Sequence, residues 1–105
     1  MKTRLSITKD IIRTARRHSC EHCAIALVLK SRFPKAAYVA VHSRSAEVLD
    51  HPTRSYYNFS FPEDLVDWID QFDEQGKGAV KPARFSVQFE AFPRTEEQFR
   101  TQLGK

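Results

Sequence analysis

The chain has 105 residues, a formal net charge of +4, and 41% hydrophobic and 29% charged residues. This is the length of one ordinary domain, and the composition is typical of a globular protein rather than a disordered one. The longest apolar run, Cys23 to Leu29, is far shorter than the roughly 20 residues that cross a bilayer, and the first residues lack the apolar core of a signal peptide. We therefore expect a cytoplasmic protein with a single α+β domain in residues 1–92 and a tail or short helix in residues 93–105.

Charge is distributed unevenly along the chain. Residues 1–35 hold nine basic and two acidic residues, whereas residues 62–74 hold six acidic residues and no basic one. The sequence therefore predicts a molecule with two oppositely charged regions. This separation weakens any inference of general nucleic-acid binding from the positive net charge.

Two helices are predicted in the first third of the chain. The first begins after Thr8, a suitable N-cap, and runs to Arg17 with an apolar stripe formed by Ile11, Ile12 and Ala15. The second covers residues 20–33, because this segment is long and rich in Ala and Leu. Pro34 ends it, since proline disfavours helical geometry in the residue before it.

Three short strands are expected next. Residues 38–42 and 46–49 form a hairpin around residues 43–45, and a turn at residues 50–53 leads to the third strand. Side chains alternate along that strand, so that Tyr57, Phe59 and Phe61 share one strongly aromatic face.

The clearest patterns lie in the second half of the chain. Pro62 begins an amphipathic helix that runs to about Glu74, and residues 83–91 alternate as a strand with one buried face. Thr95 and Gln98 have the spacing of a capping box, so the last segment is either a short helix or a frayed tail. The helix is expected to bury Leu65, Trp68, Ile69 and Phe72, and the strand to bury Phe85, Val87 and Phe89.

Together these elements predict an α+β fold in the order ααβββαβ. The sheet is expected to be antiparallel, with about four strands and with the helices packed on one face.

A basic stripe is predicted on the first helix. Its members recur at helical spacing and suit phosphates or an acidic protein surface. A solvated helix face gives the same pattern, and the sequence contains no motif that reads bases. The residues are Lys9, Arg13, Arg16 and Arg17.

A second charged surface is predicted on the helix that begins at Pro62. Its carboxylates lack the spacing of a calcium-binding loop, so they form either a solvated face or a surface for a basic partner. The residues are Asp67, Asp70, Asp73 and Glu74.

Thiols and imidazoles, the usual zinc ligands, cluster at the start of the second helix. The cluster consists of His18, Cys20, His22 and Cys23. A closed zinc site needs four ligands, and no second such motif follows in the sequence. Three interpretations stay open: a zinc site, a redox pair, and ordinary packing of Cys23 beside a half-exposed Cys20.

Catalysis has little support in the sequence. The chain has no nucleophile elbow, phosphate loop or zinc-protease motif, so we expect no enzyme, no catalytic residues and no cofactor. Tyr56, on the polar side of its strand, is expected either to stack on a ligand or to lie under Phe99 of the C-terminal segment.

Several core motifs resemble those of a family of small bacterial and phage proteins. The motifs are CAIALVL from Cys23, YVAV from Tyr38, PEDLVDWIDQFD from Pro62 and FSVQF from Phe85. The family shares a Cys-x-Ile-Ala-Leu helix, a Phe-Asp-x-Gly helix end and a closing Pro-Phe-x-Phe type strand. The resemblance covers about residues 20–90 and implies a shared fold without any active-site residues. This sequence departs from the family in the insertion of Glu74 and Gln75 before Gly76 and in a longer C-terminal tail.

The leading functional hypothesis is a non-enzymatic interaction module. The resemblance implies a phage or bacterial origin and, as the target, a host protein or ribonucleoprotein such as a defence complex. Two alternatives remain open: direct nucleic-acid binding by the basic helix, and a small zinc or redox protein centred on Cys20 and Cys23.

Overall fold

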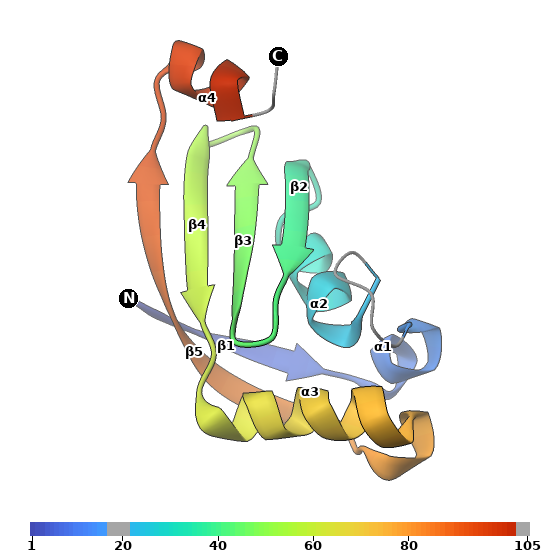
Figure 1. Cartoon of the computed structure of the whole chain (residues 1–105). Coiled ribbons are helices and arrows are strands. Elements are labelled where there is room, and N and C mark those ends of the chain that lie inside the picture. Colours follow the sequence, from blue (N-terminus) through green and yellow to red (C-terminus); the bar gives the residue numbers. More distant parts are fainter. Residues whose placement is uncertain (17–21, 103–105) are drawn as a thin grey trace.

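The computed structural model describes residues 1–16 and 22–102, and within these residues five strands form one antiparallel sheet in the order β1-β5-β4-β3-β2 (Figure 1). The strands are β1 (Lys2–Ile7), β2 (Ala36–Val41), β3 (Ser45–Asp50), β4 (Ser55–Ser60) and β5 (Ala83–Pro93). The helices of the same residues are α1 (Lys9–Thr14), α2 (Ala24–Arg32), α3 (Glu63–Gln75) and α4 (Glu96–Gln102), with one 3₁₀ turn, η1 (Lys77–Ala79). None of these helices is long and apolar enough to cross a membrane.

The predicted α+β class and antiparallel sheet are confirmed, but the sheet has five strands rather than about four, because the predicted element order lacked β1. Only Leu5 and Ile7 are large apolar residues in β1, and Lys2 and Arg4 alternate with them. A strand this short and basic gives a weak pattern. Its pairing partner, β5, lies far along the sequence, so no local turn pointed to it.

The main core lies against one face of the sheet. Alternation places the inward side chains of all five strands on this face, and buried side chains of α1, α2 and α3 pack against them. The expected inward positions Phe85, Val87 and Phe89 of β5 are confirmed, the first two as buried and the third as half-buried. The strands contribute Leu5, Ile7, Val39, Val41, Ala46, Val48 and Phe59, and the helices contribute Ile12, Ile25, Leu29, Leu65 and Phe72.

The sheet curls around α2. The first half of β5, residues 83–88, pairs with β1, and its second half, residues 88–93, pairs with β4, so β5 joins two parts of the sheet (Figure 1). Helix α2 contacts both edge strands, β1 and β2. The face that carries the core is therefore concave, and α2 lies within it.

The predicted helix that follows Pro62 is confirmed as α3. Leu65 and Phe72 are buried, and Trp68 packs on Phe72 with ring centroids 5.7 Å apart. Gly76 ends the helix with a positive φ of 89°, a conformation that glycine adopts without strain.

The first two helices are shorter than predicted. Helix α1 ends at Thr14, because the backbone at Ala15 is extended with ψ 152°. The expectation of a helix through Arg17 is therefore wrong at Ala15, and Arg17 lies outside the described residues. Helix α2 begins after Cys23, which is its N-cap, rather than at residue 20.

Some buried apolar residues lie outside the main core. Leu49 and Phe99 are buried but do not belong to the core cluster. Phe99 comes from α4, which lies beyond the ends of β3 and β4, and its ring is 4.9 Å from that of His51 (Figure 1). Of the two expectations for the C-terminal segment, the structure has the helix, with a reciprocal capping box between Thr95 and Gln98.

Candidate functional site

The predicted basic stripe is only partly assembled. Lys9 and Arg13 are exposed one turn apart on α1, but Arg16 follows the helix and Arg17 is not among the described residues. The Arg13 guanidinium lies 3.2 Å from the Asp10 carboxylate, which neutralises part of its charge. Lys9, Arg13 and Arg16 therefore do not form one helical stripe.

The predicted acidic residues lie along α3. Asp67, Asp70 and Glu74 are exposed, whereas Asp73 is half-buried. They have no pocket beside them among those found in the described residues, and an exposed row of carboxylates is well solvated.

The thiol of Cys23 has a structural role as the N-cap of α2. Its Sγ accepts a hydrogen bond from the Ala26 N–H at 3.4 Å. Burial raises the pKa of this thiol, and the nearby Asp73 carboxylate raises it further. Since thiolate is both the nucleophile and the metal ligand, this environment disfavours both roles for Cys23.

Of the other three residues in the predicted cluster of thiols and imidazoles, the structure describes one. His22 is exposed, and His18 and Cys20 lie outside the described residues. No group of three metal-ligating side chains occurs in the part of the chain that the structure describes.

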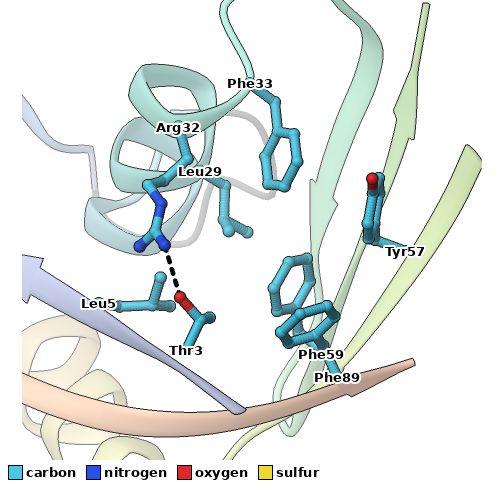
Figure 2. A pocket seen from close by; sticks show the side chains of 8 residues that line it. All are labelled: Thr3, Leu5, Leu29, Arg32, Phe33, Tyr57, Phe59 and Phe89. Carbon is cyan, nitrogen blue, oxygen red and sulfur yellow. Dashed lines mark hydrogen bonds between the residues drawn. The ribbon is translucent and has the colours of Figure 1, made fainter. Parts of the chain in front are cut away.

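A pocket that sequence reasoning did not identify lies at the end of α2, on the concave face of the sheet. It has a volume of about 290 Å³. Its floor consists of the buried side chains of Leu5, Leu29 and Phe59. Three half-buried aromatic rings form its walls, and Thr3 and Arg32 form its rim (Figure 2). The wall residues are Phe33, Tyr57 and Phe89.

The aromatic walls contact one another around the hollow. Figure 2 shows Phe33 projecting from the end of α2 toward Tyr57, and their ring centroids are 5.0 Å apart. On the sheet, Phe89 lies 6.2 Å from Tyr57 and 5.4 Å from Phe59. These contacts hold the rings together as one cluster along one side of the pocket.

The pocket exists because α2 is short. The helix ends at Arg32, and Pro34 prevents its continuation, so α2 covers only part of the concave face. Tyr57 and Phe89 lie beyond the covered part and remain half-exposed. Apolar surface of this kind costs about 25 cal/mol for each Å² that stays in water, which a bound apolar group would recover.

At the rim of the pocket, the exposed Arg32 side chain joins the end of α2 to β1. Its Nη1 donates to the Arg4 carbonyl oxygen at 2.8 Å and its Nη2 donates to Thr3 Oγ1 at 2.5 Å (Figure 2). A guanidinium has five N–H donors, so these bonds leave donors for a further acceptor. The described lining residues include this cation and no carboxylate.

A second groove lies on the other side of Phe33. It has a volume of about 360 Å³ and runs between the end of α2 and β2. Its described lining again includes one cation, Lys30, and no carboxylate, and the exposed Lys35 lies in the loop beside it. The lining residues are Lys30, Phe33, Pro34, Ala36, Ala37, Tyr38 and Val39.

Sequence reasoning assigned the aromatic residues of this site to the core. The alternation pattern places Tyr57 and Phe59 on one aromatic face, which the structure confirms. The pattern does not show how much of that face a helix covers. The sequence did contain one signal: the helix that Pro34 ends is short relative to the number of large aromatic rings on the face that it would have to cover.

The other aromatic residue singled out from the sequence, Tyr56, is half-buried on the opposite face. Its ring centroid lies 6.1 Å from that of Phe92, and the Arg94 guanidinium carbon lies 5.3 Å from the Tyr56 ring centroid. Phe99 contacts His51 instead. Tyr56 thus packs with Phe92 and Arg94 on the face of the sheet that points away from the main core.

Comparison of the chain with family models, with curated proteins and with solved structures found no match. The resemblance to small bacterial and phage proteins stays a prediction from the sequence motifs. Functional inference therefore depends on the site itself.

Proposed function

We propose that the protein is a non-enzymatic binding module that takes an apolar or aromatic side chain of a partner protein into the pocket beside Arg32. The observation that carries this proposal is a hollow lined by three half-exposed aromatic rings over a floor of buried side chains. Sites that bind ligands are typically concave and mostly apolar, with a few polar groups that set orientation.

Charge indicates which partners suit the site. Arg32 lies at the rim, Lys30 lines the neighbouring groove, and Lys35 follows Pro34. Because the described lining includes cations and no carboxylate, it favours a ligand with a carboxylate next to the anchoring side chain. The proposed ligand is therefore an acidic segment with an aromatic or aliphatic anchor.

The class of partner and the compartment rest on the sequence. The resemblance to bacterial and phage proteins makes a host protein, or the protein part of a ribonucleoprotein, the proposed target. The proposed compartment is the cytoplasm, where a thiol such as Cys23 stays reduced.

The test uses two small probes that differ only in charge. N-acetyl-phenylalanine carries a carboxylate beside its ring, and N-acetyl-phenylalanine amide does not. Two-dimensional amide NMR should show shifts for Thr3, Phe33, Tyr57 and Phe89, with a dissociation constant of about 1 mM for the charged probe. The amide should bind about threefold more weakly, as expected for one exposed ion pair.

Two variants with the same chemical change control for unfolding. Phe33→Ala removes a wall of the pocket and should abolish the shifts, whereas Phe92→Ala removes an exposed ring on the opposite face and should preserve them. Binding of single-stranded oligonucleotides that weakens steeply with salt, together with no response to either probe, would contradict the proposal and favour nucleic-acid binding.

A further inference from the structure

The two edge strands of the sheet, β1 and β2, differ in how their outward backbone groups are protected. At the β1 edge, the Phe89 N–H bonds to the Met1 carbonyl oxygen, and alternation from that pair turns the Arg4 backbone toward the open side. The Arg32 side chain occupies this position by donating to the Arg4 carbonyl oxygen. With the charges of Lys2 and Arg4 along it, this edge is protected against another strand.

At the β2 edge, the described residues provide no such protection. Strand β2 contains neither a charged residue nor a proline, and its side chains are apolar apart from the Tyr38 hydroxyl. The His42 N–H bonds to the Ser45 carbonyl oxygen at 2.7 Å, so alternation turns the N–H and C=O groups of Val39 and Val41 away from β3. Among the described residues, no backbone hydrogen bond outside the strand pairing reaches these two residues.

Space for a further strand exists beside this edge. The groove of about 360 Å³ is lined by Ala36, Ala37 and Val39 of β2 on one side and by Phe33 and Pro34 on the other. Ala36 and Ala37 have small side chains and are partly exposed. Alternate side chains of an added strand would point into this groove.

Charge selects the occupant. Lys30 lines the groove, Lys35 precedes β2, and Arg44 lies in the hairpin at its other end. A second copy of this chain paired antiparallel about Val39 would place each Lys35 beside the partner's Ser43 and Arg44, so like charges would meet. An acidic segment meets Lys30 and Lys35 at the start of β2, whereas Arg44 at the other end is already paired with Glu63 at 3.3 Å.

We propose that β2 is a strand-addition site, which takes an extended acidic segment of a partner protein as a sixth strand. This inference deepens the proposed function by giving the binding mode beside the same pocket, and it rests on that function for the identity of the partner as a protein. Main-chain hydrogen bonds to Val39 and Val41 supply affinity, and the groove beside Phe33 selects alternate apolar side chains.

The test uses synthetic heptapeptides with the intact protein. The first alternates Asp and Val, the second replaces each Asp by Lys, and the third keeps Asp and Val but carries N-methyl groups on alternate backbone nitrogens. Amide hydrogen exchange at Val39 and Val41 is measured by NMR. The Asp peptide at saturation should slow exchange at both amides about tenfold or more, while the Lys and N-methyl peptides should have little effect.

Variants of the protein test the charge argument. Lys35→Glu should weaken binding of the Asp peptide by about fivefold, as expected for reversing one exposed ion pair, and Lys77→Glu, an equal change on η1, should not. Both positions are exposed, so both variants are expected to fold.

Four outcomes are distinguishable. Protection of Val39 and Val41 by the Asp peptide supports the proposal. If the phenylalanine probe shifts the pocket amides but the Asp peptide leaves these amides unprotected, strand addition is overturned and the proposed function stands. If neither probe has an effect, both proposals fail. Protection that rises with protein concentration without peptide indicates a second copy on the edge and overturns the acidic partner.

Discussion

The Tyr56 hydroxyl donates a 2.7 Å hydrogen bond to Glu47 Oε2 across the face of the sheet that points away from the main core. Glu47 Oε1 also lies 3.9 Å from His42 Nε2, so one carboxylate serves two neighbours. The pair links β4 to β3 where the two residues lie diagonally across the ladder.

Tyr56 should make stability sensitive to alkaline pH. Partial burial, followed by the hydrogen bond to Glu47 and its negative charge, raises the pKa of Tyr56 to about 12. The folded state therefore holds this proton more tightly than the unfolded state, whose tyrosine pKa is about 10. The contribution is fully present below about pH 10 and is lost as pH rises toward 12.

Ultraviolet difference titration of the wild type and Tyr56→Phe checks this assignment. The variant should lack the phenol that titrates last and should lose less stability in the alkaline range. An unchanged titration curve would mean that another of the three tyrosines has the raised pKa.

Two phenylalanines offer a matched test of the core. Phe72 on α3 is 1% exposed, and Phe92 on β5 is 39% exposed. Phe72→Ala should lower the free energy of unfolding by about 3–5 kcal/mol through lost burial and the cavity that remains. Phe92→Ala should cost less than about 1.5 kcal/mol, its main loss being the ring contact with Tyr56. Urea denaturation measures both, and equal losses would contradict the placement of the core.

Cys23 should be a slow nucleophile in the folded protein. In a Cys20→Ser background it is the only thiol, and its raised pKa lowers the thiolate fraction near neutral pH. Alkylation by iodoacetamide at pH 8 should be at least about tenfold slower in the native protein than in urea. Equal rates in the two conditions would argue against the buried cap and reopen a redox role.

The same residue should stabilise α2. Cys23→Ala removes the acceptor for the Ala26 N–H and should cost about 1–2 kcal/mol, whereas Cys23→Ser retains an acceptor and should lose less. Chemical denaturation of the two variants distinguishes loss of the cap from loss of volume.

Arg32 should contribute to the stability of β1 as well as to binding. Arg32→Gln loses the two bonds to Arg4 and Thr3 and should cost about 1–2 kcal/mol. Arg84→Gln, a change at another exposed arginine, should stay within about 0.5 kcal/mol of the wild type. Faster amide exchange across β1 in the first variant alone is the expected signature.

Much of the fold follows from local patterns in the sequence. The apolar spacing of Leu65 and Phe72 predicted α3, and the alternation of Phe85 and Val87 predicted β5, because each pattern repeats over many residues. Strand β1 was missed because its pattern is short and its partner distant. The end of α1 was missed because nothing in the residue type of Ala15 dictates an extended backbone.

The candidate site depends on a relation that no local pattern contains. Phe33, Tyr57 and Phe89 have the composition of core residues. Whether they enclose space or fill it depends on where the last turn of α2 crosses the curled sheet. Arg32 entered the sequence reasoning only as part of a charge count, because its bonds to β1 join positions 28 and 29 residues apart.

Strand β5 is the last in sequence of the five described strands, yet it lies between β1 and β4. During synthesis on the ribosome, β1 emerges first and waits without a partner until residues 83–88 are released. The three-stranded meander β2-β3-β4 can pair within itself much earlier, since its connections are short. A nascent chain stalled before β5 would thus expose two unfinished edges, and release of residues 83–93 joins both parts in one step.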